Sequence, residues 1–141
     1  MGVYIIEYGQ DTNFVLAVQD QMLGSSVVIK NKKGLAPRYA FWDVDFDSGV
    51  ISLNSSGGGI AIGATPIAAE SYAKLALRQD AIHFDFFLHP GYLMVDVNPP
   101  LCLDVKDRRI ADGTPTWLYP YNGSPAQQWN LIPLRNLNAF E

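Results

Sequence analysis

The sequence has one cysteine, Cys102, and two histidines, His83 and His89, among its 141 residues. A single cysteine excludes a disulfide within the chain, and the apolar neighbours Leu101 and Leu103 favour a buried thiol over a nucleophile. The histidines stand in no spacing that is typical of a metal site or of a catalytic pair. We therefore expect neither enzymatic activity nor a bound metal or cofactor.

Charged residues are also sparse, at 17% of the chain, and the formal net charge of −4 has the wrong sign for binding a polyanion. The tight basic cluster of Lys30, Lys32 and Lys33 is better interpreted as a solvated turn. No apolar run approaches the ~20 residues needed to span a bilayer, and residues 1–10 lack the features of a secretion signal. We expect no nucleic-acid partner and no membrane insertion. We expect the protein to be cytoplasmic or secreted by an unconventional route.

What the sequence does contain is apolar residues, at 48%, and three units that repeat with a period of about 43 residues. The units cover about residues 2–47, 49–88 and 91–134 of a single domain, 1–141. Each unit opens with a glycine before an apolar strand, continues with a second short apolar strand, and closes with an aromatic residue in a similar sequence frame. These three landmarks are Gly2, Gly49 and Gly91; Val18, Ile62 and Val105; and Trp42, Phe84 and Trp129.

The sequence between these positions is typical of β-structure, with short apolar or alternating runs and turns rich in Gly, Pro, Asn, Asp and Ser. The only helical candidate, Ile67–Leu77, is interpreted as a turn followed by a strand, because a helix there would break the repeat. Four short strands cannot bury their own apolar face, so three units are expected to share one core. The sequence therefore predicts an all-β fold, a β-trefoil with pseudo-threefold symmetry.

The third unit carries a dense set of motifs. They are Cys102-Leu-Asp104-Val, Gly113-Thr-Pro-Thr-Trp-Leu-Tyr119, Asn122-Gly123 and Gln127-Gln-Trp129. This order resembles the repeats of ricin B-type lectins, which carry a C-L-D-V start, a G-x-x-x-x-L-W/Y strand, an N-G turn and a Q-x-W end. The first and second units match only in period, apolar frame and closing aromatic residue. The resemblance thus covers the whole chain as a fold and one third of it as a site.

The resemblance implies that Asp104 accepts hydrogen bonds from sugar hydroxyls and that Tyr119 stacks on a pyranose ring. A carboxylate suits this role because its two oxygens can accept from neighbouring hydroxyls, although a turn carboxylate bonded to nearby backbone is the alternative. Two residues before Tyr119, Trp117 points to the same side of an extended strand, where it either adds a second wall or changes the sugar preference. Thr116 and Leu118 then face the opposite side.

Two amides complete the implied site. Asn122 matches a position that donates to a sugar hydroxyl, but an N-G turn also needs Asn for its backbone, and we leave both roles open. Gln127 matches a residue that braces the aspartate or touches the sugar. Gln128 alternates to the other side, and Trp129 belongs to the core.

Several positions depart from the family pattern. Ala126 stands where sugar-binding members often have Asn, and Tyr121 stands where many have a second cysteine. In the first unit, Ala17 stands at the aspartate position, Lys30 near the aromatic position and Ala40 at the closing glutamine. In the second unit, Ala61 and Ile82 stand at the aspartate and glutamine positions. We expect sugar binding mainly in the third unit.

The function implied is that of a lectin for a galactose-type sugar, with glycans or glycoconjugates as partners. One shallow site binds weakly, so a homo-oligomer is the expected source of valency. The alternative is a β-trefoil that binds protein, such as a protease inhibitor, through the loops at Asn98-Pro-Pro-Leu or Lys32-Lys-Gly-Leu-Ala-Pro.

Overall fold

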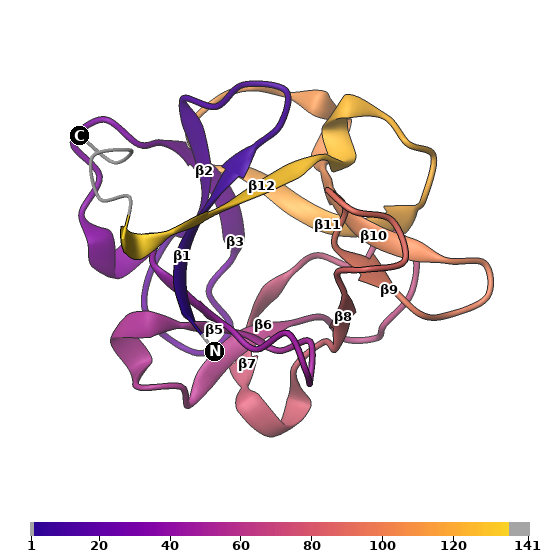
Figure 1. Cartoon of the computed structure of the whole chain (residues 1–141), viewed down its shortest axis with the longest axis horizontal. Coiled ribbons are helices and arrows are strands. Elements are labelled where there is room, and N and C mark those ends of the chain that lie inside the picture. The colour runs from indigo at the N-terminus through magenta and orange to yellow at the C-terminus, as the bar shows by residue number, and fades with distance from the viewer. Residues whose placement is uncertain (1, 136–141) are drawn as a thin grey trace.

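The computed structural model describes residues 2–135, and this part of the chain is built from twelve short strands joined by turns and 3-10 helices (Figure 1). The strands are β1 (Gly2–Tyr8), β2 (Phe14–Val18), β3 (Val27–Asn31), β4 (Trp42–Val44), β5 (Ile51–Leu53), β6 (Ile60–Gly63), β7 (Lys74–Leu77), β8 (Phe84–Asp85), β9 (Met94–Val95), β10 (Leu101–Val105), β11 (Thr114–Pro120) and β12 (Trp129–Pro133). The 3-10 helices are η1 (Pro37–Tyr39), η2 (Asn54–Ser56), η3 (Arg78–Asp80), η4 (Lys106–Arg108) and η5 (Pro125–Gln127).

The strands fall into three successive units of four, β1–β4, β5–β8 and β9–β12, arranged around a common centre (Figure 1). Neighbouring units are joined by antiparallel pairs: β4 with β5, β8 with β9, and β12 with β1. This is the predicted all-β trefoil. The segment Ile67–Leu77 forms turns and then β7, so its interpretation as a turn plus strand is also confirmed.

The closing aromatic residues of the three units lie in one core, where Trp42, Phe84 and Trp129 are all buried. The Trp42 indole Nε1–H donates to the carbonyl oxygen of Leu16 at 3.0 Å, and the Trp129 Nε1–H donates to that of Leu103 at 3.1 Å. Leu16 and Leu103 occupy the same position of their units. The repeat therefore extends from the apolar pattern to individual hydrogen bonds, which Phe84 cannot make because it has no N–H.

Three expectations based on composition can be compared with the structure. Cys102 is fully buried, as predicted. The basic cluster is not simply a solvated turn, because Lys30 belongs to β3 and the Lys32 ammonium forms an ion pair with the Glu7 carboxylate at 3.1 Å. No helix within residues 2–135 combines the length and the apolar character needed to cross a membrane.

Candidate functional site

The hairpin of β10 and β11 positions the predicted site. Its antiparallel register places Asp104 opposite Trp117 and Cys102 opposite Tyr119. Because side chains alternate along a strand, Thr116 and Leu118 are buried, whereas Trp117 is half-buried and Tyr119 is 36% exposed. The predicted outward direction of the two rings is confirmed.

Asp104 is only 6% exposed, and both oxygens of its carboxylate accept hydrogen bonds from side chains. The Trp117 indole Nε1–H donates to Oδ1 at 2.8 Å, and the Gln127 amide Nε2–H donates to Oδ2 at 3.1 Å. The alternative of a turn carboxylate bonded to neighbouring backbone is therefore not what the structure contains. Sequence reasoning placed Trp117 as a wall and missed its hydrogen bond to Asp104.

Burial also sets the electrostatics of this carboxylate. It raises the pKa of Asp104 above the ordinary value of 3.8, while the hydrogen bonds from Trp117 and Gln127 and the nearby Arg108 guanidinium act in the opposite direction. Below the carboxylate, burial and the Asp104 charge raise the pKa of the Cys102 thiol to about 12. The thiol is therefore protonated at neutral pH and serves as an apolar support for the site.

Gln127 is fully buried and lies beneath the site rather than at its surface. Besides bonding Asp104, its Nε2–H donates to the Pro120 carbonyl at 3.0 Å, and its Oε1 accepts from the Asn122 backbone N–H at 2.9 Å. Of its two predicted roles, the geometry supports bracing over direct contact with a sugar. One side chain thus connects the carboxylate to the turn that follows β11.

Asn122 uses one end of its amide in that turn. Its Oδ1 accepts the Ser124 backbone N–H at 2.9 Å, which is the backbone role expected of an N-G turn. This bond does not use the Nδ2 amino group, which is the end that would donate to a sugar hydroxyl. Both predicted roles are therefore compatible with the geometry.

Four of the five predicted site residues, Asp104, Trp117, Tyr119 and Asn122, line a cleft of about 290 Å³. Its wall is completed by three charged residues that sequence reasoning did not select, namely Glu70, Asp107 and Arg108. Asp107 and Arg108 have left-handed φ values of 58° and 54°. No motif marks these residues, because Glu70 comes from the second unit and the other two depend on an irregular turn after β10.

Aromatic rings continue beyond this cleft. Trp117 and Tyr119 are stacked, with ring centroids 5.3 Å apart and an interplanar angle of 12°. The Trp117 ring also contacts Tyr72 of the second unit, with a centroid distance of 5.9 Å. The Lys106 ammonium lies 5.9 Å and 5.7 Å from the ring centroids of Tyr72 and Trp117. The two rings of the hairpin and Tyr72 of the second unit thus form a row of three rings linked by contacts, with a cation beside it.

In the first unit, the positions that correspond to Asp104 and Gln127 are apolar. Ala17 and Ala40, at the places of Asp104 and Gln127, are fully buried and pack in one small cluster with Val15. In the β2–β3 hairpin Lys30 pairs with Val15, as Tyr119 pairs with Cys102, so the match of Lys30 to the aromatic position is confirmed by register.

The second unit is also apolar at these positions, as far as residues 2–135 describe it. Ala61, at the place of Asp104, packs with Val50 and Ala81. Ile82, at the place of Gln127, belongs to the central core. The linked carboxylate and amide of the third unit therefore have no counterpart in the described parts of the other two.

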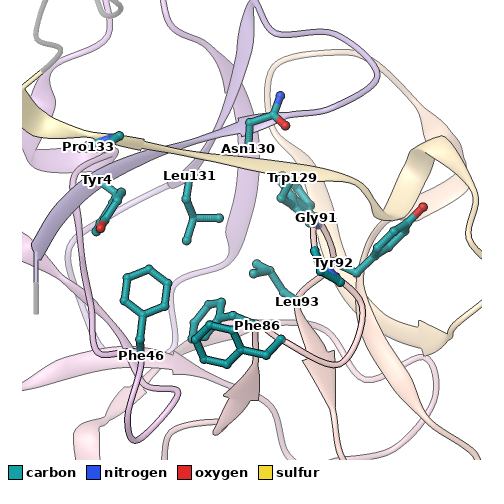
Figure 2. A pocket seen from close by; sticks show the side chains of 12 residues that line it. Tyr4, Phe46, Phe86, Gly91, Tyr92, Leu93, Trp129, Asn130, Leu131 and Pro133 are labelled. Carbon is teal, nitrogen blue, oxygen red and sulfur yellow. The ribbon is translucent and has the colours of Figure 1, made fainter.

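A larger hollow, of about 610 Å³, lies apart from Asp104 (Figure 2). Its walls are formed by Tyr4 of β1, Phe46, Phe86 and Leu93 from the turns between units, and Leu131 of β12. Figure 2 shows the rings of Phe46 and Phe86 and the side chains of Leu93 and Leu131 pointing toward one another. None of the described residues that line it is charged, so this hollow offers a sugar no carboxylate acceptor.

Comparisons with known proteins bear on the fold. No protein-family model matches the sequence, and no curated protein gives a significant match. Among solved structures, the chain is similar to the designed threefold-symmetric protein ThreeFoil, with 21% identity, a TM-score of 0.72, and coverage of 95% of this chain and 100% of that one.

Two natural lectin structures are also similar. The C-half of the earthworm R-type lectin, solved in complex with GalNAc, has 14% identity, a TM-score of 0.74, and coverage of 94% of this chain and 99% of that one. The ricin B-like lectin of Macrolepiota procera, solved in complex with lactose, has 16% identity, a TM-score of 0.71, and coverage of 93% and 94%. Ricin B-like lectins are therefore among the structural neighbours of this chain, and the likeness establishes that it has their β-trefoil fold.

Proposed function

We propose that this protein binds carbohydrate, and that a galactose-type sugar occupies the cleft of the third unit. The observation that carries the proposal is the Asp104 carboxylate, held between Trp117 and Gln127 at the base of a cleft with aromatic walls. An isolated buried carboxylate is costly, and one fixed by two donors is already oriented for a ligand.

The carboxylate has capacity left for sugar hydroxyls. Each oxygen has two lone pairs, and each accepts one hydrogen bond from the side chains described above. Two neighbouring hydroxyls of one sugar can therefore donate to Asp104, and bonds to a charged acceptor are roughly twice as strong as neutral ones. Asn122 lines the same cleft, and its Nδ2 amino group is the donor proposed for a third hydroxyl.

Tyr119 supplies the apolar part of recognition. Its stacking on Trp117 covers part of the ring, and the exposed part is available to the C–H face of a pyranose. The choice of a galactose-type sugar is supported by the structural neighbours, since GalNAc and lactose, the ligands in two of those structures, both contain a ring of galactose configuration. In this proposal no bond is made or broken.

The size of the cleft sets the expected strength. A volume of about 290 Å³ is at the lower end of the roughly 300–1,000 Å³ found for small-molecule sites. One open cleft of this kind is expected to bind with a Kd between millimolar and tens of micromolar. Useful avidity then requires several copies of the chain to act together.

The test is a glycan array followed by titration calorimetry with methyl galactosides, GalNAc and lactose. The Asp104→Asn and Tyr119→Ala variants should lose binding, while Lys30→Ala, at the equivalent of Tyr119 in the first unit, serves as the matched control and should retain it. Binding that survives both third-unit substitutions would refute the site. A protease-inhibition panel run in parallel tests the rival, and inhibition without glycan binding would favour a protein-binding function.

A further inference from the structure

A second hollow, of about 450 Å³, borders the proposed sugar cleft. Glu70 lines both hollows. The second one is formed mainly by the second unit: Tyr72 and Lys74 stand at its edge, and the small residues Gly63 and Ala76 line it as well. The two hollows are therefore neighbours on the surface and share Glu70 as a lining residue.

The segment that forms this boundary is fixed by hydrogen bonds to β11. The Glu70 backbone N–H donates to the Leu118 carbonyl at 2.6 Å, and the Leu118 N–H donates back to the Ser71 carbonyl at 2.9 Å. An isolated β-bridge pairs Tyr72 with Trp117. Glu70 itself has a left-handed φ of 67°. Residues 70–72 thus run along the site strand in one defined position, and little ordering is needed when a ligand binds.

The row of rings leads from one hollow to the other. Tyr119 and Trp117 line the cleft. Tyr72, which is 41% exposed, lines the second hollow and its ring contacts that of Trp117. Successive sugar rings of an oligosaccharide present successive C–H faces, and a row of exposed aromatic rings matches that pattern.

The polar groups of the second hollow suit a sugar as well. Glu70, Ser71 and Lys74 all line the hollow. A carboxylate is an acceptor, and an ammonium and a hydroxyl are donors. Glycine and alanine in the lining allow a bulky ring to approach the backbone closely. Acceptor, donors and ring therefore surround one concave surface, as they do at Asp104.

We infer that Glu70, Tyr72 and Lys74 form a second subsite, which binds the next residue of a neutral oligosaccharide whose galactose-type residue lies at Asp104. This inference rests on the proposed function. It makes the ligand an oligosaccharide that crosses from the third unit to the second. Specificity would then depend on the linkage, because only some linkages carry the second ring past Trp117 toward Tyr72.

The experiment compares methyl galactoside with a panel of galactose-terminated di- and trisaccharides of different linkage, by calorimetry on the full chain. At least one oligosaccharide should bind wild type more tightly than methyl galactoside. Tyr72→Ala and Lys74→Ala should each reduce the affinity for that oligosaccharide, and for Tyr72→Ala the reduction should be about three- to tenfold. Both variants should keep their affinity for methyl galactoside within about twofold of wild type. Phe87→Ala is the matched control, because it removes an exposed ring that lines neither of the two hollows.

The outcomes separate the two proposals. If methyl galactoside binds in an Asp104-dependent manner but no oligosaccharide binds more tightly, the second subsite is refuted and the sugar cleft stands. The same conclusion follows if an oligosaccharide gains affinity that both Tyr72→Ala and Lys74→Ala retain. If neither monosaccharide nor oligosaccharide binds, the proposed function fails and the subsite fails with it. Unchanged thermal unfolding of the variants shows that a lost advantage does not come from misfolding.

Discussion

The sharpest single test of the site is a substitution that never touches the ligand, Gln127→Ala. Gln127 is fully buried and makes three hydrogen bonds, to the Asp104 carboxylate, the Pro120 carbonyl and the Asn122 backbone N–H. If its only role is to position Asp104 and the turn, then truncation should lower both stability and sugar affinity, although the residue lies beneath the cleft.

The magnitude follows from those bonds. A neutral hydrogen bond contributes about 1 kcal/mol and one to a charged group about 1.5–3 kcal/mol. Water entering the space left by the amide recovers part of this, so we expect Gln127→Ala to lower the free energy of unfolding by about 3 kcal/mol. For a domain of this length, that corresponds to a fall in Tm of about 10 °C.

Gln128→Ala is the matched control, because the side chain of this neighbouring glutamine is described with one hydrogen bond, from its Nε2–H to the Tyr92 hydroxyl at 2.9 Å. It should lower the free energy of unfolding by about 1 kcal/mol or less and leave sugar affinity unchanged. Urea denaturation and calorimetry with lactose measure both effects. Equal losses for the two variants, or a Gln127→Ala protein that binds sugar like wild type, would refute the bracing role.

Three further predictions concern protonation, reactivity and the core. Burial raises the pKa of Asp104 above its ordinary value of 3.8, and protonation removes the charged acceptor. Sugar affinity should therefore begin to fall at pH values above 3.8 as the solution is acidified. Calorimetry at a series of pH values checks this, and a fall that begins only below 3.8 would contradict it. The same raised pKa affects stability: the contribution of Asp104 is largest below its pKa in the unfolded state and is lost as pH rises through its pKa in the folded state. The stability of Asp104→Asn relative to wild type should therefore increase with pH between these two pKa values. Urea titrations measure this difference. With a pKa of about 12 and full burial, Cys102 should resist iodoacetamide in the native protein and react in denaturant, as mass spectrometry can show; rapid native labelling would show that the thiol is accessible. Trp42→Phe should cost about 1–2 kcal/mol by urea denaturation, because it leaves the Leu16 carbonyl without its indole donor, whereas a loss below about 0.3 kcal/mol would mean that this bond adds little to stability.

The fold could be predicted from sequence because its signals are local and recur. Each unit repeats its apolar strands and closing aromatic residue at a nearly constant spacing, and Trp42 and Trp129 are buried at equivalent positions. The pairing of Asp104 and Tyr119 could also be predicted from sequence, because both residues lie on one hairpin and strand alternation fixes the side to which each points. Only the register, which is a three-dimensional property, brings Trp117 opposite Asp104.

The rest of the site could not be found in this way, because its contacts cross between units or depend on atoms within a side chain. Periodicity directs the Trp117 ring outward, and it gives no indication that the indole N–H turns back to the carboxylate. Glu70 and Tyr72 reach the hairpin through an isolated bridge from the second unit. No pattern in the third unit refers to them.

The difference between the units has a physical reason in the interdependence of the site residues. A carboxylate at the position of Asp104 is buried, and burying it without donors costs more than the site could gain from a sugar. It is therefore stable only together with the amide of Gln127 and the indole of Trp117. Where the first unit has Ala17 at this position, it also has Ala40 in place of the glutamine, and apolar packing with Val15 replaces the polar network. The site is present or absent as a set, and this explains how one unit of a symmetric fold can hold the polar cleft while the apolar frame of the other two is preserved.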